Sequence, residues 1–236
     1  MKISEAIIDT EDIISDFLRV YVTDPRARAE ATTTQNDTST ASQTELTITP
    51  PTGYSISCIT ALTVNSVTYK KWRDFHWDYQ NNKITFFTAL STGLPIITTF
   101  KYGTKNWIYS DMPDENLNSD SWPRIDVFTV SAPGQKLGNY EAPVWATAIL
   151  QIDVWAKEGD PLEIGTKKYS GQYLTRYIGN QIAKAFEDHE DALFPLLVNY
   201  VPLSLPRTAP HNEKYLAYHT IVEVSLQGKS LGRIVY

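Results

Sequence analysis

The sequence contains only one cysteine, Cys58, among its 236 residues. A single cysteine excludes an intrachain disulfide and argues against a zinc site built on thiolates. The chain also lacks any run of about 18 apolar residues, so we expect no transmembrane helix. Its first residues mix carboxylates with aliphatic side chains, which is not the uninterrupted apolar stretch of a signal peptide.

An excess of basic residues is missing as well. The 21 Lys and Arg residues are outnumbered by 27 Asp and Glu residues, which gives a net charge of −6. Affinity for nucleic acids comes mostly from basic side chains that neutralise phosphates. We therefore do not expect a protein that binds DNA tightly. The net charge is compatible with a protein along which DNA moves without being bound.

Catalytic and cofactor-binding motifs are also absent from the sequence. None of the four histidines belongs to an HExxH or HxH pattern, and no GxSxG, P-loop or GxGxxG sequence occurs. We therefore predict that the protein is not an enzyme and has no catalytic residue, metal site or cofactor. A small hydrolase with an unrecognised site is a rival interpretation, but no nucleophile–base pair can be placed.

Two segments have the apolar spacing of amphipathic helices. Residues 3–21 carry apolar side chains three and four residues apart, and Pro25 ends the pattern. Residues 169–186 hold the same spacing over nearly five turns. Strands are predicted at 124–130 and 144–156, with further strands near the C-terminus.

The region between the first helix and these strands divides into two parts. Residues 29–44 contain no apolar side chain larger than alanine, which predicts a flexible linker. Residues 45–107 alternate short β-type runs with turn residues such as Asn65-Ser66 and Asn81-Asn82, which predicts a small sandwich or barrel.

These patterns together predict an α+β fold. Residues 1–28 and 108–236 form a host domain in which two main helices cover an antiparallel sheet. Residues 45–107 form an all-β module inserted into this host.

Aromatic residues are concentrated in the inserted module. On a strand, alternate side chains share one face, so a small module has difficulty in covering all of them. An exposed part of the set would serve to stack on sugars or to dock a protein, whereas a fully covered set would be an ordinary core. The candidate exposed residues are Trp72, Phe75, Trp77 and Tyr79. Asp74 and Asp78 flank Phe75-His76-Trp77 and are interpreted as a solvated strand face rather than a cation or sugar site.

The segment ILQIDVWAKEGDPLEIGTKKYSGQYLTRYIGNQIAKAF (149–186) resembles a pattern of the tail terminator, or tail-completion, proteins of tailed bacteriophages and their relatives among head–tail connector proteins. In this pattern a long strand, here ending in Val154-Trp155-Ala156, is followed by a polar turn and an amphipathic helix. The strand that begins at Trp122 and the N-terminal helix fit as well. The resemblance covers about residues 1–25 and 120–236. The inserted module departs from the short loop usual in such proteins.

This resemblance implies a structural virion protein at the head–tail junction. Such a protein forms a ring, usually a hexamer, that caps the tail tube and joins it to the neck. Its partners would be its own copies, the tail tube protein and a head-completion or connector protein, and genomic DNA would pass through the lumen without specific binding. The protein would be assembled in the host cytoplasm and would reside in the tail or neck of the virion, with no membrane partner.

Two polar segments are the expected contact regions of such a ring. The segment 24–44 and the loop 131–143 are long and polar enough to become ordered on binding. The residues expected at the interface with other subunits or with the neighbouring ring are Gly134, Gln135, Lys136, Leu137, Gly138, Asn139 and Tyr140. The inserted module is expected to lie on the outside of the ring, because insertions are tolerated at exposed loops.

Two further functions remain as alternatives. A carbohydrate- or receptor-binding virus protein would use the aromatic residues of the module. A baseplate or tail-tube subunit would differ from a terminator only in the ring that it joins.

Overall fold

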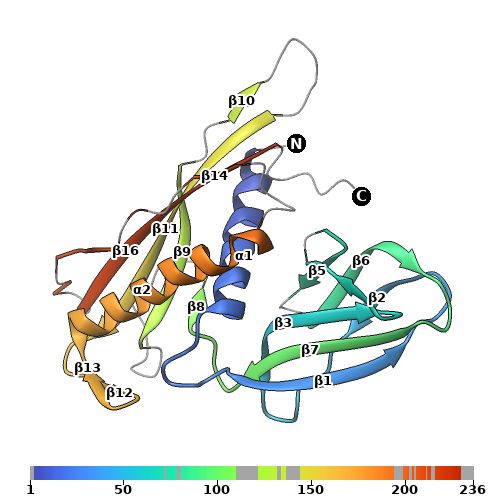
Figure 1. Cartoon of the computed structure of the whole chain (residues 1–236), viewed down its shortest axis with the longest axis horizontal. Coiled ribbons are helices and arrows are strands. Elements are labelled where there is room, and N and C mark those ends of the chain that lie inside the picture. The colour runs from blue at the N-terminus through green and yellow to red at the C-terminus, as the bar shows by residue number, and fades with distance from the viewer. Residues whose placement is uncertain are drawn as a thin grey trace. The chain divides into compact units, whose positions relative to one another are not determined.

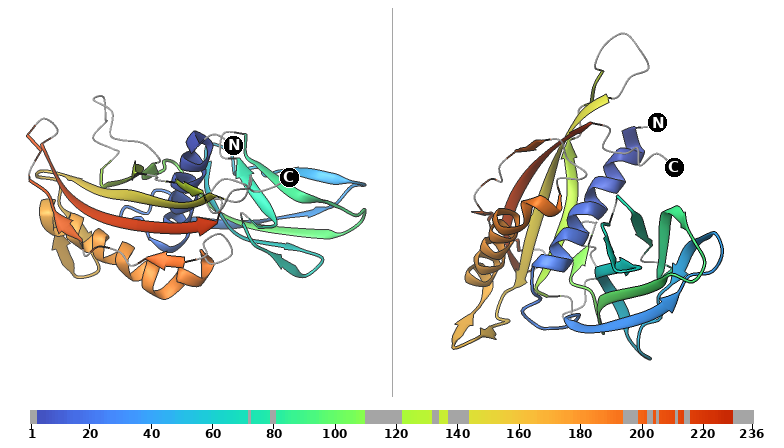
Figure 2. Two further views of the ribbon diagram at one scale, coloured as in Figure 1. Left: turned by 90° about the horizontal axis from the view of Figure 1, so that it is seen from above. Right: turned by 45° about the vertical axis from the view of Figure 1, so that its right-hand side comes forward.

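The computed structural model describes residues 3–71, 73–78, 81–109, 122–131, 134–136, 144–193, 199–201, 204, 206–210, 212–213 and 216–229. The chain divides into two compact units, one made of Met1–Arg26 and Trp107–Arg233 and the other of Ala27–Asn106. The described residues form two α-helices and mostly antiparallel sheets (Figures 1 and 2), which confirms the α+β class.

The unit Ala27–Asn106, called here the β unit, consists of two antiparallel sheets. One sheet has the strand order β1 (Ala31–Thr38), β7 (Pro95–Gly103), β3 (Ser55–Val64) and β4 (Val67–Tyr69). The other has the order β2 (Gln43–Thr47), β6 (Lys83–Leu90) and β5 (Phe75–Asp78). The strands β5, β6 and β7 alternate buried and more exposed side chains along much of their length, and β3 does so over its last residues, so each sheet contributes one face to a common core.

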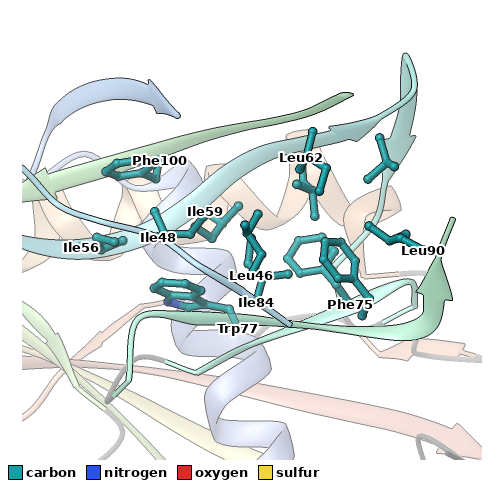
Figure 3. Packing of buried hydrophobic residues seen from close by; sticks show 13 residues of the cluster. Leu46, Ile48, Ile56, Ile59, Leu62, Phe75, Trp77, Ile84, Leu90 and Phe100 are labelled. Atoms are coloured by element: carbon teal, nitrogen blue, oxygen red, sulfur yellow. The ribbon is translucent and has the colours of Figure 1, made fainter. Parts of the chain in front are cut away.

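The core of the β unit is a single cluster of buried apolar side chains (Figure 3). Trp77 and Phe100 are its largest fully buried members. The cluster comprises Leu46, Ile48, Ile56, Ile59, Leu62, Val64, Phe75, Trp77, Ile84, Phe86, Leu90, Ile96 and Phe100. A core of this size gives the β unit its own source of hydrophobic stabilisation.

The prediction of a flexible linker over 29–44 is wrong. All eight residues of β1 pair with β7, from Ala31 opposite Tyr102 to Thr38 opposite Pro95. Backbone hydrogen bonds to β7 hold β1 in place. Because β1 is an edge strand, its polar side chains can remain partly exposed to solvent.

The side chain of Gln35 connects the edge of β1 to the edge of the other sheet. Its Nε2 atom donates to the carbonyl oxygen of Thr47 at 3.0 Å, and its Oε1 atom accepts the backbone N–H of Thr49 at 2.9 Å. The carboxamide thus satisfies one backbone acceptor and one backbone donor at the edge of the other sheet, as a neighbouring strand would. These two hydrogen bonds join the two sheets along one side of the sandwich, as in a partly closed barrel.

Two features of the β unit depend on special backbone conformations. The turn between β3 and β4 places Asn65 and Ser66 at φ of 49° and 64°, which is the conformation expected for a two-residue hairpin turn. Gly103 is required for a different reason. A Cβ atom built on it would lie 1.8 Å from the carbonyl oxygen of Arg28, so no larger residue fits where the chain enters β1.

The second unit, called here the helical unit, contains α1 (Ile3–Tyr21), α2 (Gly171–His189) and a short 3₁₀ helix (Glu190–Ala192). Among the described residues its main sheet has seven strands, joined by five antiparallel pairings and by one parallel pairing between β8 and β9. A separate hairpin is formed by β12 (Leu162–Ile164) and β13 (Lys167–Tyr169), at the place of the polar turn in the resemblance described above. The strands of the main sheet are β8 (Ile108–Tyr109), β9 (Arg124–Ser131), β10 (Gly134–Lys136), β11 (Val144–Lys157), β14 (Asn199–Val201), β15 (Arg207–Thr208) and β16 (Ala217–Lys229).

One face of this sheet is apolar and packs against the helices. The helix α2 contacts β11 and β16, and α1 contacts β8, β9 and α2. The rings of Phe17 and Phe186 lie 4.7 Å apart where the helices meet. The buried strand residues on this face are Ile125, Val127, Ala148, Leu150, Ile152, Val154, Val222, Val224 and Leu226. Neither helix combines the length and the apolarity needed to cross a membrane.

Candidate functional site

The strands β9, β10 and β11 form one long hairpin that includes part of the predicted contact loop. Gly134, Gln135 and Lys136 form β10 and pair with the first three residues of β11, so this part of the predicted loop is a strand. The remaining candidates, Leu137, Gly138, Asn139 and Tyr140, lie outside the described residues. In Figures 1 and 2 the β10 end of the hairpin extends beyond the two helices of this unit.

The outer edge of β9 is covered at one end by β8 and α1. The backbone N–H of Ile125 donates to the carbonyl oxygen of Trp107 at 2.8 Å. Farther along, the carboxylate of Glu11 on α1 accepts the N–H of Thr129 at 2.5 Å. Within the described part of the chain, no strand pairs with the outer side of β10. The free end of the hairpin therefore offers backbone groups to which another chain could pair.

Exposed apolar side chains lie beside this edge. Val130 on β9 is 57% exposed and Ile149 on β11 is 37% exposed, close to the register shift between the two strands. The shift in pairing at Ile149 and Leu150 bends a ladder locally, a feature common at sheet edges and functional sites. Together with the edge of β10, these residues define the candidate interface.

The sheet face that points away from the helices, called here the far face, buries charged and polar side chains. Arg124 and Asp126 on β9 are 3% and 0% exposed, and Asp153 on β11 is 2% exposed. Gln151 and Trp155 on β11 and His219 on β16 belong to the same face by the strand register.

Arg124 and Asp126 form a buried ion pair on this face. The Nε atom of Arg124 lies 2.7 Å from a carboxylate oxygen of Asp126, and its Nη2 atom contacts the same oxygen. The guanidinium group also lies over the ring of Tyr109, 4.2 Å from the ring centre. The arginine is therefore held by both an anion and an aromatic face, a combination that favours arginine over lysine.

Asp153 is placed directly opposite Asp126 in the β9–β11 ladder. It accepts a hydrogen bond from the Nε2 atom of Gln151 at 2.8 Å. Burial raises the pKa of Asp153 from 3.8 to about 6, against the opposing effects of the Gln151 hydrogen bond and of the Arg207 charge. At neutral pH an aspartate in this position is close to its titration range.

Aromatic packing completes the far face. Trp155 and His219 are paired across β11 and β16, and their rings stack at 4.3 Å. Trp155 also packs with Trp122 and Ala217 in a small buried cluster. Burial lowers the pKa of His219, which favours its neutral form.

The two described aromatic candidates of the β unit are buried in its core and do not form an exposed docking face. Phe75 is 2% exposed and Trp77 is 1% exposed, so the expectation of exposure is wrong for both (Figure 3). Both residues lie on β5, and the four-stranded sheet of the β unit covers the face that they share. Strand alternation alone does not show which sheet covers a face. Trp72 and Tyr79 lie outside the described residues.

The carboxylates near these aromatic residues serve local turns. Asp74 accepts the backbone N–H of Lys70 at 2.8 Å and pairs with Arg73. Asp78 accepts the backbone N–H of Asn81 at 3.2 Å. Among the described residues, no group of three His, Cys, Asp or Glu side chains is arranged to hold a metal ion.

No family model, curated protein or solved structure matches this chain. The resemblance to tail terminator proteins stays a prediction, and the structural basis for a proposal about function is the hairpin and its edge.

Proposed function

We propose that this protein is a structural component of a tailed virus that forms a ring at the head–tail junction. The ring caps the tail tube and joins it to the neck. The observation that carries this proposal is the free end of the β9–β10–β11 hairpin, where the outer side of β10 has no pairing strand among the described residues. An unpaired edge recruits a neighbouring chain, and a rotation that closes turns such contacts into a finite ring.

The finer features of the fold are part of the same proposal. The helical unit is the host domain, an antiparallel sheet covered by two main helices. The β unit is a module inserted between α1 and the first strand of the host sheet, and it lies on the outside of the ring. Its closed core and its own sheets fit a part that decorates the ring without building it.

The proposed partners are further copies of this chain, the tail tube protein and a head-completion or connector protein. Genomic DNA passes through the lumen, and the net charge of −6 disfavours tight contact with its phosphates. The protein acts without catalysis or a cofactor. It assembles in the host cytoplasm and resides in the virion.

Light scattering during size-exclusion chromatography tests the ring. We expect the full chain, alone or after addition of the tail tube protein, to reach about six times its mass of 26.7 kDa. The substitution Val130→Lys places a charge beside the proposed contact edge and should abolish the ring. The matched control Val67→Lys changes an equally exposed valine of the β unit and should leave the ring intact.

Two results would contradict this proposal. The first is a chain that stays monomeric both alone and with the tube protein. The second is a ring that Val130→Lys leaves unchanged.

A baseplate or tail-tube subunit remains an alternative, because the same strand edge would serve a different ring. Binding of the purified chain to tube ends, as opposed to baseplate components, distinguishes the two. The carbohydrate- or receptor-binding alternative has lost the support of Phe75 and Trp77, since both are buried.

A further inference from the structure

The two sheets of the β unit present outward faces that differ in charge. On the three-stranded sheet, the Nζ atom of Lys83 lies 2.7 Å from the carboxylate of Glu45. Lys83 is also directly opposite Asp78 in the β5–β6 ladder. This face has the charged side chains that are usual on a solvent-exposed sheet, and that discourage other chains from packing on it.

The outward face of the four-stranded sheet, called here the threonine face, is uncharged over most of its extent. Ten of its described residues are exposed or half-buried and carry no charge, and six of the ten are threonines. At one end of the face, Lys101 is the next outward residue of β7, and its Nζ atom is paired with Glu30 at 2.9 Å. The ten residues are Thr32, Thr34, Asn36, Thr38, Ala61, Thr63, Thr68, Pro95, Ile97 and Thr99.

The register of the strands arranges the threonine face in regular rows around one exposed aliphatic side chain. Ile97 is 45% exposed and lies between Asn36 of β1 and Thr63 of β3. Thr63 is in turn opposite Thr68 of β4, so this row crosses all four strands. In the next row, the hydroxyl oxygens of Thr34 and Thr99 lie 3.3 Å apart. Methyl and hydroxyl groups therefore surround Ile97 on every described strand of the sheet (Figure 1).

The composition of the threonine face favours burial against another protein surface. Depletion of charged residues distinguishes the core of an interface from ordinary protein surface. The size of the face is sufficient for a weak interface. Four strands about 4.8 Å apart and about eight residues long present roughly 500 Å² per copy, so two such faces bury roughly 1,000 Å².

A second copy of the same face meets the charge requirement of this surface. In a two-fold contact each residue meets the same patch of the other copy, so a charged face opposes its own charges. The threonine face has no such repulsion over its ten uncharged residues. It also offers no charge by which a strongly acidic or basic partner would be selected.

We propose that the threonine faces of two copies of this chain pack against each other and form a two-fold dimer. The two sheets stack about 10 Å apart, as the sheets of a sandwich do. Ile97 of each copy packs among the threonine methyl groups of the other. The contact uses the β unit, so it does not depend on the ring proposed for the hairpin of the helical unit.

Sedimentation equilibrium of the full chain carrying Val130→Lys tests the dimer. This substitution should remove the proposed ring, so the mass at low concentration should be 26.7 kDa. It should approach twice this value at a concentration on the order of 100 μM. If the variant still forms the ring, the ring proposal fails, and the dimer then appears as a doubling of the ring mass.

Charges placed on the threonine face should weaken the doubling. Ile97→Asp and Thr34→Asp, each added to the Val130→Lys chain, should raise the dissociation constant at least about tenfold, because each sets two like charges against each other. Val67→Asp is the matched control. Val67 is 60% exposed on β4 of the same sheet, but by strand alternation it lies on the side opposite Thr68, and the control should dimerise normally.

Two results would overturn this proposal. One is a Val130→Lys chain whose mass does not rise between about 1 and 200 μM, which needs no variant of the threonine face. The other is a doubling that Ile97→Asp or Thr34→Asp leaves as strong as Val67→Asp does. Circular dichroism of each variant identifies any chain that is unfolded, and the remaining variant of the face then decides.

Discussion

The two faces of the seven-stranded sheet use the same strands but bury different kinds of side chain. Toward the helices, Leu150, Ile152 and Val154 of β11 are all completely buried among other aliphatic groups. Toward the far face, Asp153 and Trp155 of the same strand are almost as deeply buried, next to an ion pair. The helix side is stabilised by removal of apolar area from water, which is insensitive to pH. The far face depends on charge balance, so it should respond to pH and to the loss of a single charge.

The largest effect should follow from removal of the arginine of the buried ion pair on the far face. Arg124→Met leaves the Asp126 carboxylate buried without its ion-pair partner, and we expect a loss of about 3–5 kcal/mol in the free energy of unfolding. Urea unfolding at pH 7.5 measures this loss. The exposed Arg176 of α2 provides the control, because Arg176→Met should change stability by less than about 1 kcal/mol. An equally small effect at Arg124 would mean that the ion pair does not stabilise this face.

Truncation of a buried side chain on the helix side should reduce the free energy of unfolding somewhat less than Arg124→Met does. This loss should not depend on pH. Ile152→Ala removes a completely buried side chain from beneath the helices, and we expect a loss of about 2–4 kcal/mol. The loss should be the same at pH 5 and pH 8 in urea unfolding. Ile149→Ala, on the same strand but partly exposed, is the matched control and should lose far less. A loss at Ile152 that changed strongly with pH would erase the proposed contrast between the faces.

The smallest effect should come from a buried threonine pair on the helix side. The Oγ1 atom of Thr220 donates to the Oγ1 atom of Thr175 at 2.8 Å, and both residues are fully buried. Thr175 still donates to the carbonyl oxygen of Gln172 at 3.0 Å when Thr220 is replaced. We therefore expect Thr220→Val to lose only about 1 kcal/mol, measured by thermal unfolding. A loss as large as that of Arg124→Met would show that this face also depends on a polar network.

Helices and long strands could be predicted because their periodicity is local. Residues 3–21 and 144–156 each show a regular apolar repeat, and the structure places α1 and β11 there with small differences at the ends. The strand β1 could not be predicted in the same way. Its threonines and asparagine bury little, and its position depends on hydrogen bonds to β7, which lies about sixty residues later in the sequence.

The far face illustrates a second limit. The alternation in RIDVFTV and in LQIDVW shows that Arg124 and Asp126 share one face of their strand, as do Gln151 and Asp153. It does not show that Asp126 and Asp153 are paired, because the register between β9 and β11 is fixed by the whole hairpin. The burial of Phe75 and Trp77 could not be predicted for a similar reason. Alternation tells which residues lie together but not which sheet covers them.

The contact made by Gln35 has a consequence for the behaviour of the β unit in concentrated solution. One carboxamide bridges two exposed strand margins, so an incoming polypeptide cannot use the backbone groups of Thr47 and Thr49 as a template. When such strand edges are blocked, proteins at high local concentration are less prone to pair their β-strands into fibrils. We therefore expect the side chain of Gln35 to reduce aggregation through this strand edge.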